Sequence, residues 1–123
     1  MTIFLVRHGS AGVRRDGDPL DTERHLDDVG LAQAAAIAQY LERRGAAAPI
    51  SRVVSSPAAR CVETVSPTAT SLGLGLEVCD DLFEGTDVDV TWRLATGIAD
   101  AGVSAVLCSH GDVIPELVRR AKG

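Results

Sequence analysis

The sequence has few of the residues that mark secreted, membrane or nucleic-acid-coating proteins. Its 123 residues include three Cys, two Phe, one Tyr, one Trp and one Met, and 12 basic residues against 17 acidic ones give a formal net charge of −5. No apolar run approaches the ~18 residues of a transmembrane helix, and the apolar residues 1–6 reach Arg7 without the basic region of a signal peptide. Proteins that coat nucleic acid or bind anionic membranes usually carry a basic surplus. We therefore expect a cytoplasmic protein with neither a membrane nor a nucleic-acid polymer as its partner.

The scarcity of cysteine and aromatic residues disfavours two further kinds of site. Cys61, Cys79 and Cys108 are widely spaced and no C-x-x-C pair is present, so no zinc site is expected. So few aromatic side chains also disfavour a stacking platform for single-stranded nucleic acid. The remaining composition, 46% hydrophobic and 24% charged, is typical of one globular domain, expected to span residues 1–123.

Short apolar segments alternate with helical patterns along the chain. The apolar segments show no polar alternation, which is typical of parallel strands covered by helices on both faces of a sheet. We therefore predict an α/β fold, a three-layer α/β/α sandwich with a mainly parallel four-stranded sheet. Strands are expected at residues 2–6, 50–55, 76–79 and 103–109, and helices at 28–44, 57–72, 90–101 and 112–121.

Ionisable side chains follow each predicted strand near its end. Ligands bind at the carboxyl ends of the strands in an open parallel sheet, so these side chains are expected to meet at one rim. We call them, together with one adjacent glycine, the strand-end set. Its members are Arg7, His8, Gly9, Arg60, Glu84 and His110.

The strand-end set has the chemistry needed for phosphoryl transfer. Two guanidinium groups can bind one phosphoryl group in bidentate fashion, and a neutral imidazole can attack phosphorus while a second one stabilises the oxygens. A glutamic acid can give its proton to the leaving group. A glycine beside the nucleophile lets backbone N–H groups approach the anion.

Five segments resemble, in family order, the motifs of the histidine phosphatase superfamily, also called the phosphoglycerate-mutase-like or RHG family. The resemblance covers most of the chain and implies the phosphoglycerate-mutase-like fold. The segments are residues 5–9 (LVRHG), 24–34 (RHLDDVGLAQA), 55–64 (SSPAARCVET), 82–84 (LFE) and 109–111 (SHG).

The resemblance implies a role for each member of the strand-end set, and it implies no metal and no cofactor. His8 would be the nucleophile that becomes phosphohistidine. Glu84 would be the proton donor, and the nearby acidic residues Asp80, Asp81 and Asp87 are alternatives for that role. The phosphoryl group would be bound by Arg7, Gly9, Arg60 and His110.

Within this family the short chain resembles the compact SixA-type phosphohistidine phosphatases. Residues 7–12 and 108–115 resemble more closely the phosphatase-like domain of actinobacterial MutT-type Nudix hydrolases. These resemblances imply a phosphatase acting on phosphate monoesters or phosphohistidine. Its partner would be a phosphorylated protein, a nucleotide or a small phosphorylated metabolite. A phosphate-binding module of the same fold with little turnover is the alternative, and a mutase is a third possibility that the short chain disfavours.

Overall fold

The computed structural model describes residues 1–123 and confirms the predicted alternation of strands and helices. Two short 3-10 turns, η1 and η2, lie in the connections that follow β1 and β3. The elements are β1 (Ile3–Arg7), η1 (Pro19–Glu23), α1 (Asp28–Ala47), β2 (Arg52–Ser55), α2 (Ala59–Leu72), β3 (Leu76–Val78), η2 (Asp80–Leu82), α3 (Val88–Asp100), β4 (Ala105–Ser109) and α4 (Ile114–Lys122).

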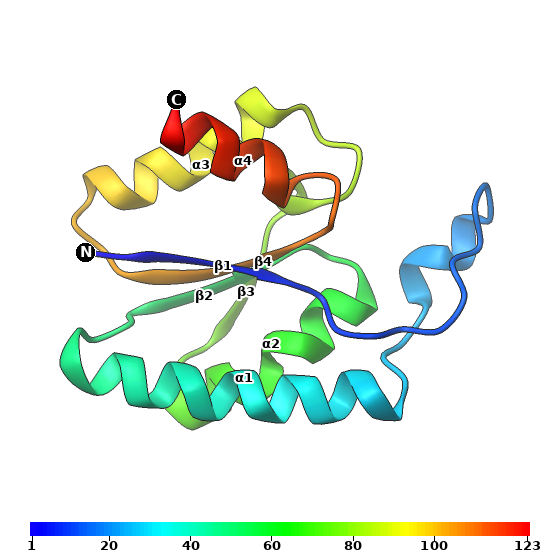
Figure 1. Ribbon diagram of the computed structural model, residues 1–123, viewed down its shortest axis with the longest axis horizontal. Helices are drawn as coiled ribbons and strands as arrows, with labels where there is room; N and C mark the ends of the chain where they lie inside the picture. The colour runs from blue at the N-terminus through cyan, green and yellow to red at the C-terminus, as the bar shows by residue number, and fades with distance from the viewer.

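The four strands form one sheet in the order β1-β4-β2-β3, and every neighbouring pair is parallel. Helices α1 and α2 lie on one side of the sheet, and α3 and α4 lie on the other (Figure 1). The predicted three-layer α/β/α sandwich is therefore confirmed. Because all the strands run in the same direction, their carboxyl ends meet at one rim of the sheet.

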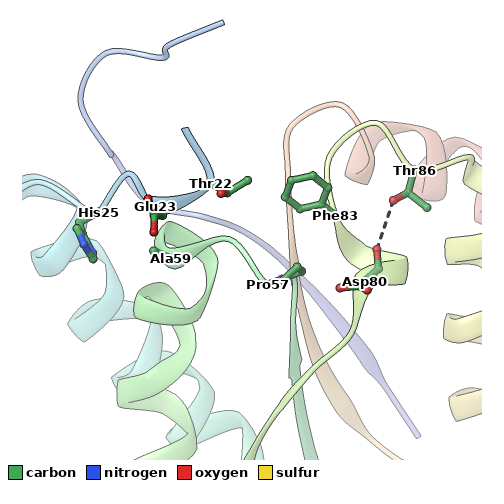
Figure 2. A pocket seen from close by; sticks show the side chains of 8 residues that line it. All are labelled: Thr22, Glu23, His25, Pro57, Ala59, Asp80, Phe83 and Thr86. Carbon is green, nitrogen blue, oxygen red and sulfur yellow. Dashed lines mark hydrogen bonds between the residues drawn. The ribbon is translucent and has the colours of Figure 1, made fainter. Parts of the chain in front are cut away.

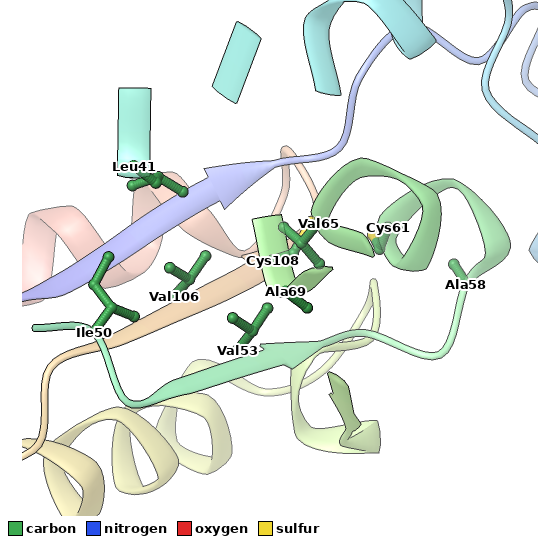
Figure 3. Packing of buried hydrophobic residues seen from close by; sticks show 9 residues of the cluster. All are labelled: Leu41, Ile50, Val53, Ala58, Cys61, Val65, Ala69, Val106 and Cys108. Carbon is green, nitrogen blue, oxygen red and sulfur yellow. The ribbon is translucent and has the colours of Figure 1, made fainter. Parts of the chain in front are cut away.

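The core is divided between the two faces of the sheet. Successive strand residues point to opposite faces, so Val53 and Val106 pack with α1 and α2, whereas Val54 and Leu107 pack with α3. Figure 3 shows the larger cluster, which also holds the fully buried Cys61 and Cys108. All five residues of β4 are buried. This interior strand therefore fixes the position of His110, which directly follows it at the rim of the sheet.

The ends of two helices show how local sequence shapes the rim. Asp27 caps α1, and its carboxylate accepts a hydrogen bond from Gly30 N at 2.8 Å. Helix α2 begins at Ala59 and not at Pro57 as the sequence predicts. The Ser56 hydroxyl lies 2.8 Å from His110 Nε2 and 3.4 Å from Ala58 N. Its hydrogen bond with His110 is therefore shorter than its contact with the start of the helix.

No helix in the structure is both long enough and apolar enough to cross a bilayer.

Candidate active site

A pocket of about 750 Å³ lies at the carboxyl ends of β1, β2 and β4, and every member of the strand-end set lines it. The pairing of β1 with β4 places Arg7 opposite Ser109. His8 and His110, which follow these two residues, therefore lie side by side with ring centroids 5.4 Å apart. Residues that are far apart in the sequence meet here because neighbouring parallel strands end at the same level.

The His8 ring is held in the orientation that a nucleophile needs. Its Nδ1 lies 2.8 Å from Gly9 O and donates its proton to that carbonyl, which leaves the lone pair on Nε2. Arg60 Nε donates to this Nε2 at 3.4 Å. Burial lowers the pKa of His8 below its ordinary value of 6.5, although the hydrogen bond to Gly9 opposes the shift. The nearby Arg60 and His110 lower this pKa further, and together these effects favour the neutral ring.

Arg60 lines the pocket and is almost completely buried, with 1% of its surface exposed. The first turn of α2 carries it. Its Nη1 donates to Asp21 O at 2.9 Å, whereas its Nη2 lies 3.2 Å from Glu84 Oε1 and 3.4 Å from His110 Nδ1. The guanidinium group thus has one donor used by the η1 turn and two donors, Nε and Nη2, directed at the pocket.

Asp21 and Arg24 hold the long β1–α1 loop against Arg60. The Asp21 carboxylate accepts hydrogen bonds from Arg24 Nε and from Arg15 N, both at 2.9 Å. The hydrogen bond with Arg24, followed by that with Arg15, lowers the pKa of Asp21 far below its usual range. Arg24 Nη1 also donates to Ala11 O at 2.9 Å. Arg24 belongs to a family motif, but no pattern in the sequence identified Asp21 as a member of the site.

His110 is fixed on both sides of its ring. Because Nδ1 accepts from Arg60 Nη2, the proton of the neutral ring lies on Nε2, which donates to Ser56 Oγ at 2.8 Å. The Phe83 ring packs against the His110 ring in a T-shaped arrangement with a centroid separation of 5.7 Å. Sequence reasoning predicted His110 but missed Ser56 as its partner.

Glu84 reaches the pocket from the loop between η2 and α3. Its carboxylate lies 4.0 Å from His110 Nδ1 and 3.8 Å from Arg14 Nη2, in addition to the contact with Arg60. Asp112 Oδ2 accepts a hydrogen bond from Gly85 N at 2.8 Å and so ties this loop to the one that carries His110. The alternative donors Asp80, Asp81 and Asp87 do not line the pocket.

The two remaining members of the strand-end set have different surroundings. The Arg7 guanidinium lies against Gly111, where an added Cβ would come within 2.8 Å of Arg7 Cζ. Gly9 N donates to Thr64 Oγ1 at 3.0 Å, so this N–H is not free to bind an anion as the sequence led us to expect. Gly9 instead allows close packing, since an added Cβ would lie 3.1 Å from Gly30 O of α1.

No three His, Cys, Asp or Glu side chains gather in the structure in a way that could hold a metal ion.

The fold and this pocket define a class of protein. Residues 3–91 match the model of the histidine phosphatase superfamily (branch 1), and the chain belongs to this superfamily. Within it, the chain is SixA-like. It is 30% identical over 131 residues to the phosphohistidine phosphatase SixA homolog of Haemophilus influenzae, covering 100% of this chain and 78% of that protein. The structure of the protein histidine phosphatase SixA complexed with tungstate superposes with a TM-score of 0.79 and 28% identity, over 96% of this chain and 74% of that one.

A second relative is longer and is named for a different activity. The 8-oxo-(d)GTP phosphatase of Mycolicibacterium smegmatis is 32% identical over 120 residues, which cover 95% of this chain. The chain spans only 36% of the length of that protein. The resemblance to the phosphatase-like domain of Nudix hydrolases stays a prediction.

Proposed function

We propose that the chain is a metal-independent phosphatase that hydrolyses phosphohistidine or phosphate monoesters through a covalent phosphohistidine on His8. The observation that carries this proposal is the state of the His8 ring. Its Nδ1 donates to Gly9 O, its pKa is lowered, and its Nε2 lone pair faces the donors of the buried Arg60. A neutral, oriented imidazole beside a buried cation is equipped to attack a phosphoryl group and to hold it.

In the first step, His8 Nε2 attacks phosphorus in line with the leaving group. The new N–P bond forms while the bond to the leaving atom breaks, and that atom keeps the electron pair and takes a proton from Glu84. Arg60 Nε and Nη2 move their hydrogen bonds to the phosphoryl oxygens. Arg7 binds the same oxygens from the end of β1. Once Arg60 Nη2 has left His110 Nδ1, Ser56 Oγ donates to Nε2 and the ring proton lies on Nδ1, which donates to the oxygens from the end of β4. These contacts stabilise the charge that develops in the transition state.

In the second step, water attacks the phosphorus of phospho-His8. The N–P bond breaks, His8 Nε2 recovers its lone pair, and inorganic phosphate is released. The Glu84 carboxylate formed in the first step takes a proton from this water. The two guanidinium groups and His110 remain on the phosphoryl oxygens in both steps, so no metal is required to neutralise them.

Phosphohistidine on a protein is the substrate class that the comparisons favour. The SixA homolog of H. influenzae matches the whole chain and 78% of its own length. The 8-oxo-(d)GTP phosphatase suggests a nucleotide, but it is a much longer protein of which the match covers 36%. A phosphate-binding module with little turnover is the second candidate. The cation-lined pocket supports it too, because Arg7, Arg60 and His110 would bind phosphate whether or not Glu84 transfers a proton.

The test is hydrolysis of p-nitrophenyl phosphate in excess EDTA, together with acid-quench trapping of a phosphoenzyme, for the wild type and His8→Ala. We expect activity and a phosphoenzyme that survive EDTA in the wild type, and neither in the variant at an unchanged melting temperature. Full activity in His8→Ala would refute the mechanism. Tight phosphate binding by a wild type that forms no phosphoenzyme would favour the binding module.

A further inference from the structure

A second cavity of about 690 Å³ lies beside the catalytic pocket, and we call it the flanking groove (Figure 2). One wall is formed by the end of η1 at Thr22 and Glu23, and the other by the segment from Asp80 to Phe83. Pro57 and Ala59 line it between these walls. Ala59 directly precedes Arg60, so the groove begins next to the phosphate-binding side chains.

The flanking groove and the catalytic pocket share no lining residue, but a third cavity lies beside both of them. A smaller cavity of about 220 Å³ shares Thr22 and Phe83 with the groove, and it shares Arg14 and Glu84 with the catalytic pocket. The Phe83 ring that lines the groove also contacts His110. A substrate whose phosphoryl group lies between the two histidines can therefore extend past Glu84 and across Phe83 into the groove.

The two cavities differ in charge. Four arginines, Arg7, Arg14, Arg24 and Arg60, line the catalytic pocket. The groove contains no Lys or Arg and has two carboxylates, Glu23 and Asp80, on its opposite walls. Its one histidine, His25, has its Nδ1 2.7 Å from Glu63 Oε2. Neither Glu23 nor Asp80 takes part in any ion pair of the structure.

This lining suits a long cationic side chain. The stem of a Lys or Arg can pack on the apolar Phe83 and Pro57 while its head stays solvated between the two carboxylates. The aromatic face adds a favourable interaction with the cation. A nucleoside di- or triphosphate fits less well, because Glu23 and Asp80 repel any phosphate beyond the one bound in the catalytic pocket.

We propose that the flanking groove binds the polypeptide segment next to the phosphohistidine of a substrate protein and selects a Lys or Arg in that segment. This inference rests on the proposed function and specifies its substrate. The catalytic pocket binds the phosphoryl group common to all substrates. The groove discriminates between substrates by the charge of the residues next to the phosphohistidine.

The experiment compares two peptides phosphorylated on histidine by phosphoramidate, one with Lys and Arg flanking the phosphohistidine and one with Glu in the same positions. The variant Glu23→Lys/Asp80→Lys reverses the charge of the groove. The matched control Glu42→Lys/Asp100→Lys makes the same change in net charge at two exposed positions outside both cavities. p-Nitrophenyl phosphate, which has no flanking segment, reports the chemical step alone.

We expect the wild type and the control to hydrolyse the basic peptide with a kcat/KM about tenfold above that of the acidic one. This factor corresponds to the free energy of two solvent-accessible ion pairs, one with Glu23 and one with Asp80. The groove variant should lose or invert this preference with its p-nitrophenyl phosphate activity within about twofold of the wild type. A preference that persists in the groove variant overturns the inference, as does a wild type that prefers a nucleoside diphosphate to both peptides. Failure of the proposed function looks different, because p-nitrophenyl phosphate would then form no phosphoenzyme.

Discussion

Replacement of Arg60 by lysine tests whether the site depends on the shape of this cation and not only on its charge. Three of its nitrogens have separate partners, with Nη1 on Asp21 O, Nε on His8 Nε2 and Nη2 near Glu84 and His110. A lysine ammonium is a single point of charge and cannot occupy these directions together. Arg60→Lys therefore keeps the positive charge but loses the planar set of N–H donors of the guanidinium group.

The expected loss follows from the two donors that face the pocket. In the proposed mechanism Nε and Nη2 of Arg60 both bind phosphoryl oxygens, and the ammonium group of a lysine in its place would retain one such contact. A hydrogen bond to a charged group contributes about 1.5–3 kcal/mol, which corresponds to a fall of about 10- to 150-fold in kcat/KM. The kcat should fall as well as the affinity, because the lost contact strengthens in the transition state.

The assay is steady-state hydrolysis of p-nitrophenyl phosphate with melting curves for each variant. Arg52→Lys is the matched control, because Arg52 also forms a two-pronged contact, with Glu77 at 3.0 and 2.8 Å, but lies outside the pocket. We expect the control to keep its full activity. If Arg60→Lys is folded and its kcat/KM stays within about threefold of that of the wild type, the site depends on the charge of Arg60 and not on the geometry of its N–H donors.

Three further predictions concern the residues around Arg60. Because burial lowers the pKa of His8 below 6.5 and only the neutral ring attacks, the acid limb of the kcat/KM profile should reach half its maximum below pH 6.5; a midpoint above pH 6.5 contradicts this. Ser56→Ala leaves the buried Nε2 of His110 with only the longer contact to Cys61 Sγ at 3.6 Å, so urea unfolding should show a loss of about 1–3 kcal/mol and phosphate inhibition should weaken; unchanged values of both would show that the hydrogen bond is unimportant. Gly111→Ala places a Cβ 2.8 Å from Arg7 Cζ and must displace the guanidinium, so the inhibition constant of inorganic phosphate should rise about tenfold with little change in melting temperature; an unchanged constant means that Arg7 does not bind phosphate.

The rim of the sheet was predictable from the sequence because its assembly follows from strand direction alone. Once the strands are parallel, side chains that follow them must meet, and His8, Arg60 and His110 do so in one pocket. The sheet order and the central place of β4 follow from pairing between distant segments. Five consecutive buried residues in β4 are consistent with that place but do not specify which strands flank it.

The supporting contacts were not predictable, because they join positions that local patterns do not relate. Asp21 bonds to Arg60 across 39 positions, and Ser56 bonds to His110 across 54. In the sequence Asp21 is one acidic residue in a polar loop, and Ser56 has the features of a helix cap. Only the folded structure shows that the carbonyl of Asp21 holds Arg60 and that the hydroxyl of Ser56 holds His110.

The pairing of β1 with β4 joins the first and last strands, and Thr2 N bonds to Ser104 Oγ across 102 positions of the chain. Closing so long a loop has an entropic cost that only the completed sheet can offset, and contacts of this kind form slowly. β1 has no other neighbour in the sheet, and β4 is its only link to β2. His8 and His110 therefore come together only when β4 inserts between β1 and β2. In a refolding experiment, recovery of enzymatic activity should follow the slowest kinetic phase, after the helices on either side have regained their circular dichroism.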